Sequence, residues 1–255
     1  MNENLIKKIK IIKENCLLSS KTLGILKNYI KPGINLYFLD KIAKEYILDN
    51  GGYPAFLGLY NYPYSICTSI NYEVAHGLPR RNIILKEGDI IKIDCGVYKN
   101  KYYSDNAYTF GVGKISKKNK KLLKITKKAL DIGIKQCKIG NKIGNIGYYI
   151  NKFIKKKKLY IVKDLVGHCI GKKLHITPEI PNYGYKNTGE KITNGMVLSI
   201  EPMVNIGTSK IKLNKNGWTY YTNNKKNSAH FEHNIAILNN KTKILSTFKY
   251  INNKK

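Results

Sequence analysis

The sequence predicts an α+β fold made of two similar halves. Two observations predict it: helical periodicity gives way to short strand-like runs, and the same succession begins again near residue 114. A shift of 107 residues lays Lys31-Pro32-Gly33 over Lys138-Ile139-Gly140. Chance similarity between two amphipathic helix pairs is the alternative explanation. We expect one catalytic domain over residues 1–255, with halves at about 1–113 and 114–250 and a cleft where they meet.

Two helices and then a set of strands are expected in the first half. Apolar residues at helical spacing over residues 3–29 indicate a helix that stops at a Lys-Pro-Gly turn. A second helix should run from its N-cap Asn35 to the glycine pair after Asn50. Residues 53–110 contain short β-branched and aromatic runs broken by Gly, Asn and Pro, which are typical of strands and hairpins.

The second half repeats this order. Ser116 can cap a helix that reaches about Lys138, and a shorter helix is expected from Ile143 to Lys156. Strand-like runs return from Leu159. The last few residues of the chain, rich in Asn and Lys, are expected to be disordered.

The composition narrows the class of protein. A chain of 255 residues that is 42% hydrophobic can bury a full core. No run is long and apolar enough for a membrane helix, and the N-terminal residues do not resemble a signal peptide. The five cysteines include no C-x-x-C pair, so neither a zinc ribbon nor a disulfide framework is indicated. We therefore expect a cytoplasmic monomer with no membrane partner.

The net charge is unusual, because 46 Lys and Arg stand against 16 Asp and Glu, which gives +30. Two interpretations stay open. The charge can attract RNA, such as the surface of the ribosome, since lysines that neutralise phosphates supply affinity without sequence preference. Alternatively, the excess of Lys beside Asn, Ile and Tyr reflects codon drift in an AT-rich genome. No DNA partner is expected.

Three acidic residues lie in runs that otherwise have the pattern of buried strands. They are Asp94 in DIIKIDCGVY, Glu201 in VLSIEPMV and Glu232 in AHFEHNIAIL. Removing a charge from water costs several kcal/mol even after relaxation, so a buried carboxylate must be protonated, paired or bound to a metal. One such residue alone is as often an ion-pair partner as a ligand.

A predicted hairpin places a fourth acid, Asp105, next to Asp94. If the strands meet at a two-residue turn at Lys99-Asn100, residues whose numbers sum to 199 face each other, which pairs Asp94 with Asp105. Like charges opposed in this way repel each other unless a cation lies between them. His168, in a glycine-flanked segment, adds an imidazole. Four acids and one imidazole would balance two divalent ions such as Mn, Fe, Co or Zn and indicate a paired-metal hydrolase.

The order of these five residues, with NYEVAHGLP ahead of them, resembles the bacterial type I methionine aminopeptidases. The resemblance covers essentially the whole chain, and its motifs IDCGVY, GHCIG, SIEPMV and FEHNIAIL are specific. It implies the pita-bread fold, in which two pseudo-symmetric α+β halves surround a curved antiparallel sheet. Aminopeptidase P, prolidase and creatinase share this fold and usually carry an additional N-terminal domain.

The resemblance also implies roles for the metal ligands. Asp94 binds one ion, His168 and Glu201 bind the other, and Asp105 and Glu232 bridge both. The ions activate the attacking water and stabilise the negative charge that develops on the scissile carbonyl. Glu201 is the implied proton shuttle. The reaction would remove the initiator methionine from nascent proteins with a small second residue, after deformylation.

Other residues are assigned to the substrate by the resemblance. His175 would donate to the substrate carbonyl, and His76 would contact the amide nitrogen. Tyr62, Cys67 and Trp218 would form the methionine pocket, to which Leu174 is a further candidate. From local sequence alone, both histidines would be structural, and Tyr60, Tyr62 and Trp218 would be ordinary core residues.

Three positions depart from the family pattern. Ala75 stands where cysteine is common, Cys169 where glycine is usual, and His230 where glutamine is frequent. None is expected to be a ligand, but each could alter the rate, and His230 is expected to lie outside direct contact with the ligands. An inactive protein of the same fold that binds the ribosome or RNA is the alternative function; the five intact ligands argue against it. A dipeptidase or proline-specific peptidase is a third possibility, which chain length disfavours.

Overall fold

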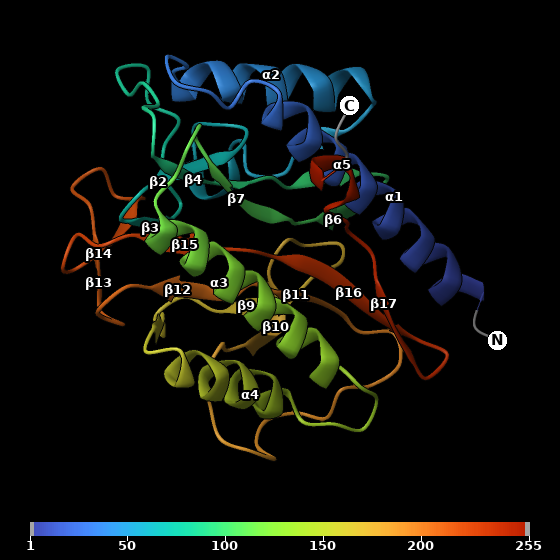
Figure 1. Ribbon diagram of the computed structural model, residues 1–255. Coiled ribbons are helices and arrows are strands. Elements are labelled where there is room, and N and C mark those ends of the chain that lie inside the picture. The colour runs from blue at the N-terminus through green and yellow to red at the C-terminus, as the bar shows by residue number, and fades with distance from the viewer. Residues whose placement is uncertain (1–2, 253–255) are drawn as a thin grey trace.

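The computed structural model describes residues 3–252, in which helices and antiparallel strands follow each other in two similar successions (Figure 1). The predicted α+β pita-bread architecture is confirmed, and the four long predicted helices agree with the structure within two residues at each end. The predicted disorder of the last few residues falls on residues 253–255, which lie outside the described residues. The helices are α1 Glu3–Lys27, α2 Leu36–Asp49, α3 Lys117–Gln136, α4 Ile143–Lys156 and α5 Lys249–Asn252, with a 3₁₀ turn, η1, at Leu59–Asn61.

The strands form several small antiparallel sheets, of which the largest has the order β10-β9-β11-β16-β17. The others are β1-β5-β6, β2-β4-β7, β15-β12-β8 and β13-β14-β3. In chain order, the strands are β1 Tyr53–Pro54, β2 Cys67–Ile70, β3 Glu73–Ala75, β4 Ile90–Asp94, β5 Val97–Lys99, β6 Tyr102–Ser104, β7 Ala107–Gly111, β8 Tyr160–Ile161, β9 Gly167–Cys169, β10 Ile176–Ile180, β11 Val197–Ile200, β12 Met203–Asn205, β13 Ile211–Leu213, β14 Tyr220–Thr222, β15 Ser228–His230, β16 His233–Leu238 and β17 Lys241–Ile244.

The predicted helix caps are present. The side chain of Asn35 accepts the N–H of Phe38 at 2.8 Å, and Ser116 accepts the N–H of Asn119 at 3.1 Å. Each bond satisfies one of the donors that the first turn of a helix leaves unpaired. Gly51 follows α2 with a positive φ of 70°, a conformation that glycine adopts without strain.

The 107-residue offset recurs in the hydrogen bonds of the backbone. The N–H of Gly33 donates to the carbonyl of Leu85, and the equivalent N–H of Gly140 donates to the carbonyl of Ile192. The isolated bridge between residues 35 and 84 likewise has its counterpart between residues 142 and 191. Chance alignment of two amphipathic helix pairs would not reproduce these bonds, so the two halves are pseudo-symmetric.

Helices cover the strands and bury a large apolar cluster with two smaller clusters beside it. The helix α1 packs against β5, β6 and β16, whereas α3 packs against β11, β12 and β15 (Figure 1). The core cluster includes apolar side chains from both helix pairs, among them Leu39, Ile47, Ala129 and Ile146. No helix within residues 3–252 has the length and apolar character needed to cross a membrane.

The predicted hairpin register is wrong: residues that face each other have numbers that add up to 201, not 199. The turn lies at Asn100-Lys101, both with positive φ as in the hairpin turns that match strand twist, so Asp94 faces Ala107. Because side chains alternate with a period of two, this error keeps Asp94 and Asp105 on the same face as diagonal neighbours. The proximity of the two acids therefore survives although their direct opposition does not.

Candidate metal and peptide site

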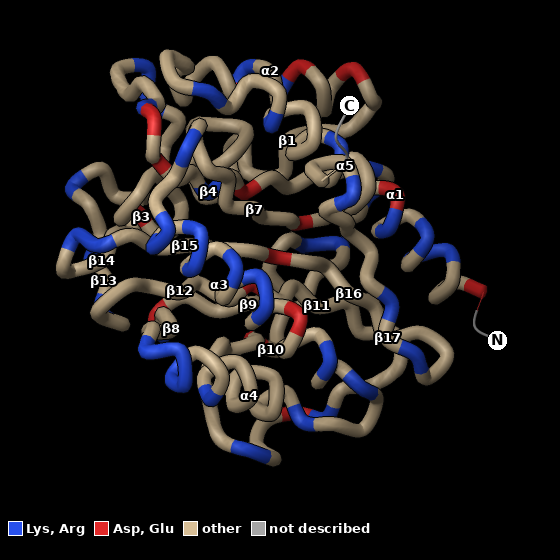
Figure 2. Tube along the Cα trace, viewed as in Figure 1, with Lys and Arg blue, Asp and Glu red and all other residues tan. Residues whose placement is uncertain are grey.

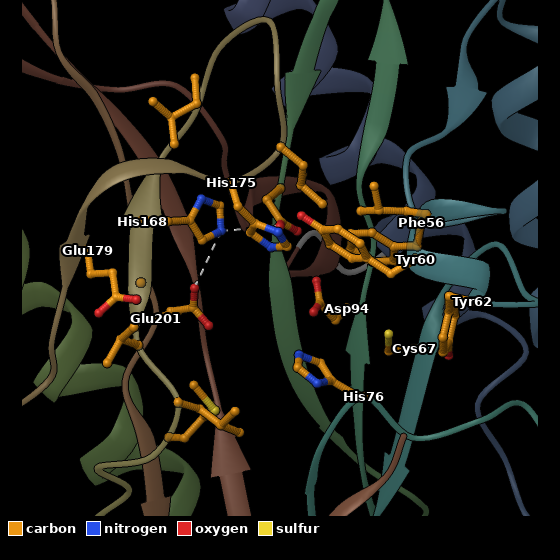
Figure 3. Close-up of a pocket in the computed structure, with 18 of the residues that line it drawn as sticks. Phe56, Tyr60, Tyr62, Cys67, His76, Asp94, His168, His175, Glu179 and Glu201 are labelled. Carbon is orange, nitrogen blue, oxygen red and sulfur yellow. Dashed lines mark ion pairs between the residues drawn. The ribbon is translucent and has the colours of Figure 1, made fainter. Parts of the chain in front are cut away.

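The structure brings the five predicted metal ligands together where the strands of both halves meet. Figure 3 shows Asp94, His168 and Glu201 of this set around the cavity. In the first half, Asp94 ends β4 and Asp105 directly follows β6. In the second half, His168 lies in β9, Glu201 follows β11, and Glu232 lies between β15 and β16. A side chain that leaves the end of a strand reaches the space between the halves, which explains this convergence.

Short distances link the cluster. The Nε2 atom of His168 lies 3.7 Å from Oδ2 of Asp105 and 3.7 Å from Oε1 of Glu201. One ligand atom each from Asp105, His168 and Glu232 lie within 4.8 Å of one another. Three donors at such spacing can share one ion, and the two remaining acids lie beside them.

The donors fit divalent cations. Among the described residues, Oδ1 of Asp94 and Oε1 of Glu232 are buried without any hydrogen-bond partner. A buried carboxylate oxygen without a partner carries a desolvation cost that a bound cation removes. A set of carboxylates with one imidazole suits borderline and hard divalent metals. Divalent metal binding is therefore the chemistry that this donor set supports.

The electrostatics of the cluster point the same way. Burial raises the pKa of Asp105 to about 7 and that of Glu201 to about 7. Burial and then the charge of Asp105 raise the pKa of Asp94 well above its ordinary value, and the pKa of Glu232 is raised for the same two reasons. Several acids crowded away from water cannot all ionise unless positive charge is added.

The neighbour of His168 orients its ring. The Nδ1 atom of His168 lies 3.0 Å from the carbonyl oxygen of Cys169, a contact that places the proton on Nδ1 and leaves the Nε2 lone pair toward the acids. The side chain of Cys169 points to the opposite face of the strand, because successive residues alternate. The cysteine therefore does not crowd the ring, in contrast to what its position in the sequence suggests.

His76 and His175 lie on the wall of the same cavity (Figure 3). Although both residues are exposed at the cavity, desolvation by the surrounding protein lowers the pKa of each ring to about 4, and the neighbouring imidazoles add to this effect, His230 at His76 and His168 at His175. Both imidazoles are neutral at neutral pH and can donate or accept one hydrogen bond. The ring of Tyr60 stacks on His175 with centroids 6.1 Å apart.

One end of the cavity, whose volume is about 330 Å³, is apolar. The rings of Tyr62 and Trp218 meet edge to face at 5.0 Å, with Cys67 and Leu174 beside them. The Tyr62 hydroxyl lies within 3.1 Å of the carbonyls of Ile66 and Gly77, so its polar end is satisfied. The result is a slot with aromatic and sulfur walls.

Sequence reasoning missed several parts of the wall. Tyr60 is 71% exposed, so its prediction as a core residue is wrong, and its positive φ together with the neighbouring Gly58 marks the turn that carries it outward. Phe56 and Glu179 also line the cavity, and no local signal distinguishes either of them.

The three departures have different surroundings. Ala75 is buried in β3. The prediction that His230 lies outside direct contact with the ligands is wrong: its Nε2 lies 3.5 Å from Oε2 of Glu201. His230 is the last residue of β15, two residues before Glu232, and this position brings its ring close to Glu201. Burial lowers the pKa of His230 to about 4, so the ring is neutral.

A buried asparagine ties together the segments that carry the acids. The Oδ1 atom of Asn234 accepts the N–H of Asp105 at 2.7 Å and the thiol of Cys16 at 3.3 Å. Its amide nitrogen donates to the hydroxyl of Ser199 at 2.6 Å. Ser199 also hydrogen-bonds with Glu232 and lowers its pKa against the effect of burial. One side chain thus sets the separation of β16, β11 and the loop after β6.

Strands that hold a carboxylate–imidazole cluster beside an apolar slot define a class of metal-dependent peptidase. The model of metallopeptidase family M24 matches residues 10–239, and the chain belongs to this family. A methionine aminopeptidase of Clostridium perfringens is 43% identical over 248 residues, which cover 97% of this chain and 98% of that protein.

Solved structures give the same result. A methionine aminopeptidase of Thermotoga maritima superposes with a TM-score of 0.93 at 34% identity, with 94% of this chain and 97% of that chain covered. An Xaa-Pro dipeptidase of Bacillus anthracis has a TM-score of 0.76 at 19% identity over 98% of this chain and 61% of that chain. The second likeness shows a shared fold alone.

Proposed function

We propose that this protein is a methionine aminopeptidase that removes the initiator methionine from nascent proteins with a small second residue, after deformylation. The observation that carries the proposal is the union of the acid–imidazole cluster with the apolar slot of Tyr62, Cys67 and Trp218 in one cavity. A relative that bears this name is 43% identical over nearly the whole chain, which supports the same activity here.

The site would hold two divalent ions, with Co, Mn, Fe and Zn as candidates. Asp94 would bind one ion, His168 and Glu201 the other, and Asp105 and Glu232 both. When bound, such ions lower the pKa of water to near neutrality and polarise the scissile carbonyl. The raised pKa of each acid means that loading releases protons, since the ligands bind in their ionised form.

Glu201 is suited to move a proton. Its carboxylate would accept a proton from the attacking water and return it to the leaving amine. The neutral imidazole of His175 would donate to the substrate carbonyl, and His76 would contact the amide nitrogen. Both rings face the cavity from different elements, so they can hold the peptide bond between them.

The apolar slot would receive the methionine side chain. The aromatic edges of Tyr62 and Trp218 and the sulfur of Cys67 favour contact with a polarisable thioether. A free N-terminal amine would lie toward the acids, and a formyl group would remove its positive charge. The single catalytic domain would span residues 1–255, with its halves divided near residue 114.

The cytoplasm is the compartment in which nascent N-termini become accessible, and a monomer suffices because one chain contributes every proposed ligand. Contact with the ribosome surface is a further part of the proposal. The alternative, an inactive protein of the same fold, would need a defect in the site, and the convergence of the five proposed ligands with both histidines supports the active enzyme.

The test is a peptide assay. Protein purified without chelators and supplied with Co or Mn should release methionine from Met-Ala-Ser, and EDTA should stop the release. The formylated peptide should resist, and a peptide with a bulky second residue should react slowly. Unchanged turnover of His168→Ala or Glu201→Ala protein would contradict the assigned site.

A further inference from the structure

The two helix pairs related by the pseudo-symmetry carry very different charge. Residues 3–49, which contain α1 and α2, have nine Lys and five acids, a net charge of +4. Residues 117–158, which contain α3 and α4, have fifteen Lys and one acid, Asp131, a net charge of +14. Nearly half of the charge of +30 therefore lies in about one sixth of the chain. Codon drift acts on both pairs alike and does not explain this difference.

The lysines of α3 form a stripe. Lys117, Lys121, Lys124, Lys128 and Lys135 recur at intervals of three, four and seven residues, which places them on one side of the helix. All five side chains are exposed. At a rise of 1.5 Å per residue the stripe is about 27 Å long. Figure 2 shows Lys recurring along the visible face of α3 and at the end of α4.

A groove runs beside the stripe. Its walls include five lysines and one acid, its floor includes Ile125 and Phe153, and its volume is about 630 Å³. The acid, Asp131, lies 3.9 Å from Lys128 and neutralises only one of the walls' charges. The lysines of the walls are Lys121, Lys124, Lys127, Lys128 and Lys157.

We propose that the α3–α4 groove binds the phosphate backbone of a folded RNA. Lysines in a row neutralise successive phosphates and release their counterions, which gives affinity independent of sequence. The choice of RNA over DNA rests on the proposed function, since an enzyme that acts on nascent chains works where RNA is abundant. The cavity of the peptidase site contains no residue of α3 or α4, so an RNA on this face leaves that cavity open.

A membrane surface fits this face less well. Proteins that lie on acidic lipid insert apolar side chains beside their lysines. Neither α3 nor α4 exposes a large apolar side chain, because their apolar residues pack in the core. A row of lysines beside a recessed floor favours a curved polyanion over a flat one.

The test compares two variants with equal loss of charge. One replaces Lys117, Lys121, Lys124 and Lys128 by Gln; the control replaces the exposed Lys7, Lys10, Lys13 and Lys31 of the other helix pair by Gln. Fluorescence anisotropy measures binding of a labelled RNA hairpin between 50 and 300 mM salt. The stripe variant should bind at least tenfold more weakly, and its salt slope should fall by about 3. The control should change by less than twofold.

Several outcomes would overturn the proposal. They are equal losses in both variants, binding by neither protein at 150 mM salt, and binding of vesicles rich in acidic lipid without binding of RNA. Replacing the four stripe residues by Arg should keep the affinity for RNA. If the quadruple Gln variant does not fold, two double variants take its place: Lys117→Gln with Lys121→Gln, and Lys124→Gln with Lys128→Gln. Release of methionine from a free peptide should stay unchanged in all of them, so failure of the peptidase proposal and failure of the RNA proposal are separate results.

Discussion

The two halves of this protein contribute residues at equivalent positions to the site, but the surroundings of these residues differ. The 107-residue offset places Asp94 and Glu201 at equivalent strand ends, after β4 and β11. Asp94 has Asp105 as its nearest charge, whereas Glu201 lies against the rings of His168 and His230. Burial and the charge of Asp105 raise the pKa of Asp94 well above its ordinary value, whereas burial raises the pKa of Glu201 to about 7 against the opposing effect of His168. In the proposed mechanism Asp94 therefore acts as a metal ligand alone, whereas Glu201 would be both a metal ligand and the proton carrier.

The largest expected effect comes from neutralising the proton carrier. Glu201→Gln should lower kcat by about 10²- to 10⁴-fold, because the amide cannot shuttle a proton. The equivalent change in the first half, Asp94→Asn, should act mainly through metal content, whereas Glu201→Gln should lower kcat further even in protein that has been loaded with metal. Kinetics on Met-Ala-Ser together with metal analysis of each variant separate the two roles. Equal metal loss with equal residual activity in both variants would remove the distinction between the halves.

A change at Asn234 should loosen both halves at once. Asn234→Ala removes the bonds to the N–H of Asp105 and the hydroxyl of Ser199, so the affinity for metal should fall by about 10- to 100-fold. Calorimetric titration with Mn measures this fall. A matched control is Asn145→Ala, which removes a comparably buried and bonded asparagine on α4 without touching the acids. A similar loss in the control would assign the effect to general destabilisation.

The apolar slot joins Tyr62 and Cys67 of the first half to Trp218 and Leu174 of the second. Trp218→Leu should raise KM for methionyl peptides by about 2- to 10-fold through lost contact between sulfur and aromatic ring. Metal content should not change, because Trp218 contacts Tyr62 rather than the acids. Steady-state kinetics with methionyl and norleucyl peptides provide the measurement. An equal change for the two substrates would exclude a role of the ring in recognising sulfur.

The smallest effect concerns stability. The folded pKa values of Asp105 and Glu201, about 7, lie above the values near 4 of an unfolded chain. The folded state therefore binds more protons between pH 4 and 7, and the metal-free protein should lose stability as the pH rises through this window. A bound cation should offset the loss, so the difference in Tm between metal-loaded and EDTA-treated protein should grow by a few degrees from pH 5 to pH 8. A difference that shrinks with rising pH would contradict the crowding of ionised acids.

Much of this protein follows from local pattern. Spacing of apolar residues fixes α1 to α4, and polar side chains at positions 35 and 116 fix where two of them begin. Acids inside apolar strand runs, Asp94, Glu201 and Glu232, indicated metal chemistry, because a buried charge needs a partner wherever the strand lies. These predictions depend only on residues that are close in sequence or on the free-energy cost of removing a charge from water.

Tertiary structure alone decided the finer geometry. The hairpin turn at Asn100-Lys101 depends on the twist of the paired strands, and one step in the turn alters every pairing of the ladder. The contact between His230 and Glu201 and the bonds of Asn234 join residues from separate strands, and the exposure of Tyr60 depends on a turn in the left-handed region. The local pattern of apolar and polar residues predicts whether a residue is buried. Which distant side chains come into contact depends on how the strands of the two halves pack, and short stretches of sequence do not encode that packing.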